Sequence, residues 1–304
     1  MSDSSPRAIY VAVGANAAVA ATKFAAGAVA GSSAILAEAV HSLIDACDGL
    51  LLLFGRRRAA RPPDEKHPFG HGREAYFWSF VVALLFFSFG SALTVAQGVR
   101  QWLNPSSLGH PGWGYLVLGA SAIFDATSFA VAYKQLRQDA RGRSTWTVIH
   151  ESKNPALFSI VLEDFADLVG LVIAFLGLAL SHALNMPRID AVAAIAIGVL
   201  LGAIAFVLLV ETHGLLIGEA AGPRVLADVC SIATNVPGVV KATSPSSLHF
   251  GPDDVVVAMW VQFDHALDAD EVAQRVALIE QRIRGEHPEV RHVYLQSGPL
   301  AETR

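Results

Sequence analysis

The chain has 304 residues, of which 53% are apolar and only 16% are charged. Because soluble domains carry roughly 25% charged residues, this composition excludes an ordinary soluble enzyme. Residues 1–218 carry 15 Lys/Arg and 15 Asp/Glu, so the net charge of −5 belongs to the last 86 residues. We therefore expect a membrane domain followed by an acidic aqueous domain, and the acidic domain argues against nucleic acid as a partner.

Six segments are long and apolar enough to cross a bilayer, which takes about 20 mostly apolar residues. They run near Ala8 to Ala30, Ser33 to Phe54, Tyr76 to Trp102, Trp113 to Tyr133, Pro155 to Leu184 and Ile189 to Thr212. Residues 1–213 are therefore predicted to form an all-α membrane domain, a bundle of six transmembrane helices. The start, MSDSSPRAIY, lacks the pattern of a removed signal peptide, so the first segment is expected to stay in the membrane.

Positive charge alternates between the predicted loops. The second loop holds Arg56, Arg57, Arg58, Arg61, Lys66 and Arg73, and the fourth holds Lys134, Arg137, Arg141, Arg143 and Lys153. The first and third loops have no Lys or Arg, and the fifth has only Arg188. By the positive-inside rule, both termini of this multi-pass protein are expected in the cytoplasm. The compact chain favours a bacterial inner membrane.

Residues 214–304 are predicted to form a small cytoplasmic α+β domain of order αββαβ. Its elements are a helix near Pro223 to Asn235, strands near Val239 to Phe250 and Val255 to Phe263, a helix near Asp268 to Gly285, and the strand VRHVYLQ. Asp268 and Glu271 have the spacing of a capping box. Cys47 and Cys230 lie in unlike regions, so neither a disulfide framework nor a Cys-pair zinc site is expected.

Ionisable residues inside membrane spans are costly, so each is a functional-site hypothesis. His41 and Asp45 in the second span, and Glu163 and Asp167 in the fifth, are both four apart, which places each pair on one helical face. Two such faces opposed would bring four ligands to one point. One imidazole and three carboxylates suit zinc, and the oxygen-rich set also suits Mn²⁺, Fe²⁺ or Co²⁺. The alternative is polar helix pairing without a metal.

Other charged residues have weaker patterns. Asp48 lies near the face of Asp45, and Asp164 is offset by about 100° from Glu163, so both are expected to orient a ligand or to take up a proton rather than to be primary ligands. Interhelical pairing or snorkelling is expected for four further residues, which are Lys23, Glu38, Asp125 and Glu211.

A second constellation lies in the loop segment PPDEKHPFGHG, where Asp64, His67 and His71 are spaced by three and four. Short histidine-rich segments with a carboxylate bind metal. The alternative is a solvated loop that holds two histidines by chance.

Three segments carry a resemblance to a known family: SSAILAEAVHSLIDACDG, PPDEKHPFGHGREA and VLEDFADLVG. With the six spans and the C-terminal domain, they resemble the cation diffusion facilitator family, of the zinc-transporter type. The resemblance implies a homodimer that exports a divalent cation in exchange for protons by alternating access, with one transport site per protomer between spans two and five. It implies a secondary transporter without a cofactor rather than an enzyme.

Within that resemblance, His41 and Asp45 match the family pair in span two, while Glu163 stands where many members have histidine. This departure resembles the branch of mitochondrial-type zinc transporters, whose fifth span also reads Leu-Glu-Asp. That branch need not carry an acid at the position of Asp167, so Asp164 and Asp167 remain alternatives for the fourth ligand. Asp64, His67 and His71 match a loop site that some members use for a further zinc.

In the C-terminal domain the resemblance is one of fold, because VRHVYLQSG offers no His-x-Asp pair. We interpret its histidines as ordinary surface or interface residues, namely His249, His265, His287 and His292. A rival of another class, a membrane-embedded metallo-hydrolase, lacks a His-Glu-x-x-His segment. A transport-dead homologue that serves as a binding partner or sensor is a third alternative.

Overall fold

The computed structural model describes residues 6–31, 33–105, 111–140 and 155–298. Three cations of the predicted fourth loop, Arg141, Arg143 and Lys153, lie outside these ranges. The chain forms two compact units. The helical unit comprises residues 1–55 and 77–212, and the C-terminal unit comprises residues 56–76 and 213–304. The predicted second loop therefore groups with the C-terminal unit.

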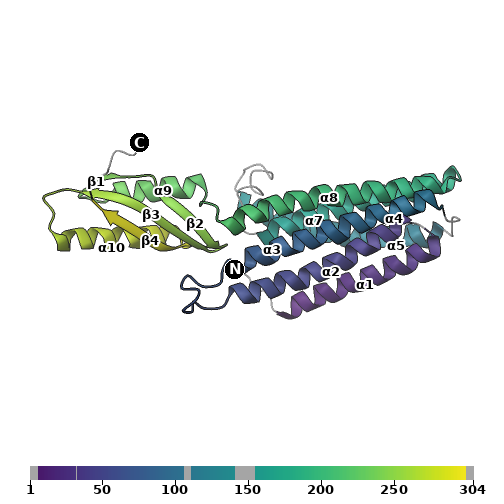
Figure 1. Ribbon diagram of the computed structural model, residues 1–304, viewed down its shortest axis with the longest axis horizontal. Coiled ribbons are helices and arrows are strands. Elements are labelled where there is room, and N and C mark those ends of the chain that lie inside the picture. The colour runs from purple at the N-terminus through teal and green to yellow at the C-terminus, as the bar shows by residue number, and fades with distance from the viewer. Residues whose placement is uncertain (1–5, 32, 106–110, 141–154, 299–304) are drawn as a thin grey trace. The chain divides into compact units, whose positions relative to one another are not determined.

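The long helices are drawn from purple to green in Figure 1. They are α1 (Pro6–Ala30), α2 (Ser33–Ala59), α3 (Glu74–Leu85), the π-helix η1 (Phe86–Ser91), α4 (Ala92–Leu103), α5 (Pro111–Ala140), α7 (Pro155–Ala183) and α8 (Pro187–Ile217). Each predicted span is helical, and α3, η1 and α4 together form the third one.

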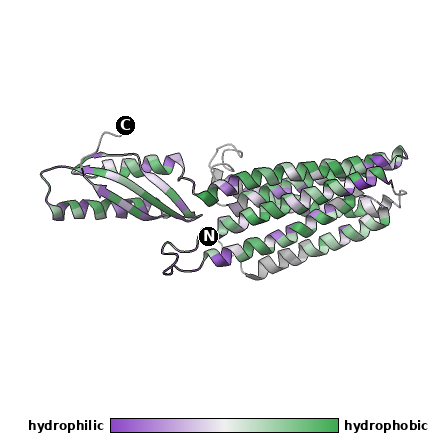
Figure 2. Cartoon of the chain, viewed as in Figure 1, coloured by the Kyte–Doolittle hydropathy of each residue, from purple (hydrophilic) through white to green (hydrophobic). Residues whose placement is uncertain are grey.

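Three stretches of the described chain are helices long and apolar enough to cross a membrane: Glu74–Leu103, Gly114–Lys134 and Pro187–Ile217. Helices α2 and α7 are equally long but carry clustered acids. Crossing by all six helices therefore stays a prediction. Figure 2 shows the mostly hydrophobic colouring of the helical unit, and large apolar side chains such as Ile123 and Val131 are each 71% exposed. Such a surface suits lipid rather than water.

Local sequence signals explain where the helices end. Gly31, with φ 63°, separates α1 from α2, and Asn185, with φ 56°, separates α7 from α8. These left-handed conformations are ones that glycine and asparagine adopt most readily. Pro187 begins α8 because the first helical position needs no backbone N–H.

Close packing between α4 and α8 depends on small residues. A methyl group at Gly98 would lie 2.7 Å from Ile195, and one at Gly198 would lie 2.7 Å from Val95. The Ser91 hydroxyl donates a hydrogen bond of 2.8 Å to the Gly198 carbonyl. Small residues let helix backbones approach one another, which is how helices associate within a bilayer. Helix α5 packs along both α1 and α7.

The C-terminal unit contains a mixed sheet and two helices. Its elements are α9 (Pro223–Thr234), β1 (Val239–Ala242), β2 (Ser246–Gly251), β3 (Asp254–Phe263), α10 (Ala269–Glu286) and β4 (Val290–Ser297). Strands β1 and β2 both pair antiparallel with β3, and β4 pairs parallel with it. Since β4 and β2 pair with the same residues of β3, they lie on its opposite edges.

The predicted order αββαβ is wrong in one detail, because the first predicted strand is two strands, β1 and β2. Residues 243–245 between them are Thr-Ser-Pro, and Pro245 cannot donate a ladder hydrogen bond. The capping box is confirmed, since the Asp268 side chain accepts from the Glu271 backbone N–H and the Glu271 side chain accepts from that of Asp268. Alternate residues of β3 are buried with α9 and α10 in one apolar core.

Candidate metal centre

His41 of α2 lies between two carboxylates. Its Nδ1 is 3.5 Å from Asp45 Oδ1, one turn along α2, and its Nε2 is 2.5 Å from Asp167 Oδ1 of α7. The imidazole is completely buried, and one ligand atom from each of the three residues lies within 4.8 Å of the others. The predicted pairing of the α2 and α7 faces thus places three of the four predicted ligands together.

The imidazole is enclosed by the third span as well. The ring of Phe86, in η1, lies 5.1 Å from the His41 ring. The π-helix is a widened turn of a kind often found at functional sites. No sequence signal predicted it, because Phe86 stands within an uninterrupted apolar run. Phe86 covers the imidazole with an apolar surface.

Glu163, the fourth predicted ligand, lies outside the three-residue cluster but close to it. It interacts electrostatically with both Asp45 and Asp48. Glu163 and Asp48 are 8% and 1% exposed, respectively. Among the described residues, Glu163 Oε1 and both Asp48 carboxylate oxygens have no hydrogen-bond partner. Buried carboxylate oxygens require a partner, so protons or a cation would stabilise this group.

Asp164 is directed to a different helix. Its Oδ2 accepts a hydrogen bond of 2.9 Å from the Ser128 hydroxyl of α5. Asp167, rather than its rival Asp164, is therefore the residue beside His41. The contact with Ser128 suits an orienting role for Asp164 between α5 and α7.

The charges on the first, second and fourth spans form a buried network. Lys23 Nζ donates a hydrogen bond of 2.8 Å to Ser42 Oγ and lies 3.5 Å from Glu38 Oε2 and 3.8 Å from Asp125 Oδ2. The predicted interhelical pairing is confirmed for Lys23, Glu38 and Asp125. Glu211 is half-buried in α8.

The loop constellation is also brought together. Asp64 Oδ1 is 3.1 Å from His67 Nδ1, Asp64 Oδ2 is 3.4 Å from His71 Nε2, and the two rings lie 4.4 Å apart. A hydrogen bond from the His67 backbone N–H holds the pKa of Asp64 below its usual range, which keeps this carboxylate charged. The three side chains form a cluster with suitable ligand atoms for one metal ion.

Aromatic contacts attach this loop to β2. The ring of Phe69, between the two loop histidines, stacks on Phe250 at 4.7 Å, and the Arg73 guanidinium lies 4.7 Å from the centre of the same Phe250 ring. A methyl group at Gly72 would collide with the Phe250 carbonyl oxygen. Sequence reasoning did not find these contacts, since Phe69 and Phe250 are far apart in the chain.

The histidines of the C-terminal unit occupy separate places. His265 is exposed, His287 Nε2 lies 3.6 Å from Asp228 Oδ2, and His292 Nε2 lies 3.7 Å from Asp254 Oδ1. His249 is buried within the chain itself, so its prediction as a surface or interface histidine is wrong. Its place on β2 turns the ring inward, where Nδ1 lies 3.3 Å from the Gly251 carbonyl oxygen.

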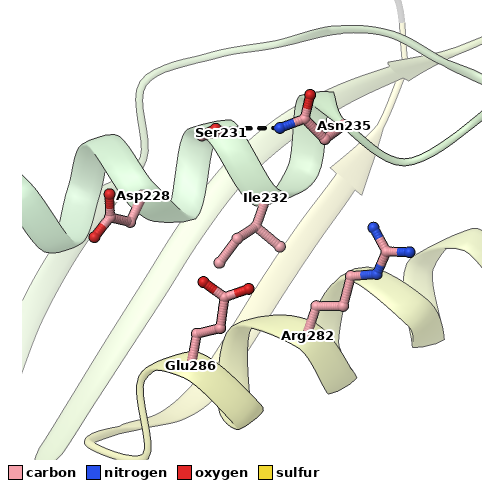
Figure 3. Close-up of a pocket in the computed structure, with 6 residues that line it drawn as sticks. All are labelled: Asp228, Ser231, Ile232, Asn235, Arg282 and Glu286. Carbon is pink, nitrogen blue, oxygen red and sulfur yellow. Dashed lines mark hydrogen bonds between the residues drawn. The ribbon is translucent and has the colours of Figure 1, made fainter.

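A pocket of about 230 Å³ lies between α9 and α10 (Figure 3). Its lining is Asp228, Ser231, Ile232, Asn235, Arg282 and Glu286. Asn235 Nδ2 donates a hydrogen bond of 3.2 Å to Ser231 Oγ across its upper edge. The lining includes none of the predicted metal ligands.

Comparison with known proteins identifies relatives. The chain is 31% identical over 228 residues to the human proton-coupled zinc antiporter SLC30A9, mitochondrial, a match that covers 73% of this chain and 40% of that protein. It is 30% identical over 233 residues to metal tolerance protein C4 of Arabidopsis thaliana, covering 76% and 51%. It is 25% identical over 249 residues to the magnetosome protein MamM of Paramagnetospirillum magneticum, covering 82% and 73%.

The match to the human antiporter spans less than half of that protein's length. Residues 9–217 match the family described as the cation efflux transmembrane domain, which includes all of α2 and α7. The family's description and the name of the human relative are those of transporters rather than of hydrolases. The chain is therefore a member of the cation efflux family, the cation diffusion facilitators of zinc-transporter type.

Proposed function

We propose that this protein exports a divalent transition-metal ion, with Zn²⁺ as the first candidate, in exchange for protons. His41, Asp45 and Asp167 hold the ion, and Glu163 completes the ligand set as the helices move. The observation that carries the proposal is the burial of His41 between Asp45 and Asp167, beside further acids without hydrogen-bond partners. Such a group of ligands is stable only with bound cations or protons.

The same atoms bind metal and protons, which supplies the coupling. Metal that enters from the cytoplasmic side displaces protons from His41 and the carboxylates, because each ligand must be deprotonated to bind. Protons that return from the other side release the metal. His41 is suited to this exchange because its imidazole faces Asp167. Either a proton is shared between the two side chains, or a metal ion takes the place of that proton. Alternating access follows from helices that rock about the site.

The ligand set favours zinc without excluding related ions. A histidine with carboxylates suits tetrahedral Zn²⁺, and the human relative is named as a zinc antiporter. An oxygen-rich set with Glu163 also suits Mn²⁺, Fe²⁺ or Co²⁺, which makes an exporter of one of these ions the second candidate.

We also propose six membrane-spanning helices with both termini in the cytoplasm of a bacterial inner membrane, and a homodimer as the functional assembly. The charged loop between α2 and α3 supports the orientation, because Arg56, Arg57 and Arg58 lie at the α2 C-terminus. Asp64, His67 and His71 are proposed as a second, loop metal site on each chain.

Transport into proteoliposomes tests the function. Wild type should accumulate Zn²⁺ when a pH gradient is imposed, and His41→Ala should abolish accumulation while the protein remains folded and monodisperse. Competition by Mn²⁺, Fe²⁺ and Co²⁺ in the same assay ranks the ions. Zinc transport by His41→Ala at the wild-type rate would contradict the proposal.

A further inference from the structure

We propose that Lys23 is a positioning residue for the His41 site. Its ammonium group holds the face of α2 that carries His41 in the rotation that places the imidazole beside Asp167. The inference rests on the proposed function, since it concerns the same site, but Lys23 is not a metal ligand and does not touch His41.

The contacts of Lys23 surround His41 along α2. Lys23 comes from α1, and its Nζ reaches Ser42, the residue after His41, and Glu38, the residue one turn before it. Both contacts are on the buried side of α2, and Lys23 and Glu38 are completely buried. Together they fix α2 on both sides of the imidazole, so a rotation of α2 would break a charged hydrogen bond.

The same group ties α2 to the other helices of the site. Lys23 lies 3.8 Å from Asp125 Oδ2 of α5. The second carboxylate oxygen of Glu38 faces Gly170 of α7, where a methyl group would collide with it. Gly170 is one turn beyond Asp167, so Glu38 contacts α7 next to the residue that faces His41. Helices α1, α2, α5 and α7 therefore meet in one charged layer adjacent to the candidate site.

Burial of a lysine costs free energy unless its charge is compensated. If Lys23 only stabilised the packing of the helices, an apolar side chain of similar size would do so equally well. Here the ammonium also neutralises Glu38 and Asp125, two carboxylates that could otherwise compete with the site for the metal cation. Loss of the ammonium should therefore change metal affinity in protein that is still folded, which distinguishes positioning from a contribution to stability alone.

The test measures Zn²⁺ affinity per folded chain, by calorimetry on monodisperse full-length protein in detergent. The background carries His67→Ala and His71→Ala, so that the loop cluster does not contribute. Lys23→Met should weaken binding about tenfold, since a charge-assisted hydrogen bond that orients the site is lost. Lys23→Arg, which keeps the charge, should recover most of that loss. Lys134→Met, which removes an exposed lysine of α5, should bind like the background.

Ser42→Ala provides a second route if Lys23→Met does not fold, because it removes only the 2.8 Å hydrogen bond and should still weaken binding severalfold. Unchanged affinity in the folded Lys23 and Ser42 variants would overturn the inference. The proposed function fails separately if the background protein shows no Zn²⁺ binding that His41→Ala removes.

Discussion

His41 Nε2 and Asp167 Oδ1 lie 2.5 Å apart, which joins α2 to α7 at a buried point between two helices that both carry acids. Asp164, three residues earlier on α7, instead accepts a hydrogen bond from Ser128 of α5. The two aspartates of one helix thus have different partners, and we predict different roles for them.

Asp167→Asn should abolish zinc transport, whereas Asp164→Asn should reduce it by about tenfold, in the range typical of groups that orient a ligand. The first change removes a charged ligand, and the second keeps a hydrogen-bond acceptor for Ser128. Initial rates of Zn²⁺ uptake into proteoliposomes measure both. Equal loss in the two variants would show that the contact with His41 does not define the site.

Glu163→His should shift ion preference towards Zn²⁺ and away from Mn²⁺. An imidazole in place of a carboxylate makes the ligand set less oxygen-rich, which disfavours Mn²⁺ more than Zn²⁺. Competition between the two ions during uptake gives the preference directly. If the ratio is unchanged while His41→Ala remains inactive, Glu163 is not part of the ligand set.

Gly170→Ala should disturb the site through Glu38. The added methyl group would collide with Glu38 Oε1, and overpacking of a buried position costs about 1–3 kcal/mol. Gly119→Ala in α5 is the matched control, because nothing lies within 4 Å of its added methyl group. Thermal unfolding in detergent compares them. If Gly170→Ala is as stable as Gly119→Ala, α2 and α7 move apart at this contact without a cost in stability.

The loop cluster should bind one metal ion per chain. His67→Ala with His71→Ala should lower the amount of zinc bound by one equivalent, because a single carboxylate remains. His265→Ala is the control, as this histidine is exposed in the C-terminal unit. Elemental analysis after equilibrium dialysis measures the stoichiometry, and an unchanged zinc content would contradict a loop site.

Asp254 gives a pH-dependent prediction for the C-terminal unit. Burial raises the pKa of Asp254, and the nearby charges of His292 and Arg291 lower it by less. An acid whose folded pKa is raised stabilises the fold while it is protonated, and this contribution is lost as the pH rises through the folded pKa.

At pH 7, β3 and β4 should therefore be better protected from hydrogen exchange in the Asp254→Asn variant than in wild type. The difference should disappear as the pH falls to about 3, below the unfolded pKa of about 3.9, because the wild-type carboxyl is then protonated in both the folded and the unfolded state. Asp253→Asn, at an exposed neighbour, should change neither. Lower protection in Asp254→Asn at pH 7 would show that the contact with His292 outweighs burial.

The spacing of four residues predicted that His41 and Asp45 share a face, and the structure agrees because helical periodicity fixes that relationship locally. Which acid of α7 meets His41 depends on the rotation of one helix against another, which no local pattern encodes. The π-helix at Phe86 escaped prediction because Phe86 stands within an uninterrupted apolar run, which carries no signal of a widened turn. The division of β1 from β2 was available from Pro245, which stands within the polar run Thr243 to Ser247.

The proposed transport depends on the exchange of metal and protons at His41. Simultaneous recording of Zn²⁺ uptake and proton efflux in the same proteoliposomes tests this exchange. The control is His182→Ala in α7, a histidine whose ring Nδ1 lies 3.0 Å from the Leu178 carbonyl oxygen of the same helix. We expect coupled fluxes in wild type and in the control, and loss of both in His41→Ala. Zinc uptake without proton movement, or coupled fluxes that survive in His41→Ala, would contradict proton-coupled exchange at His41.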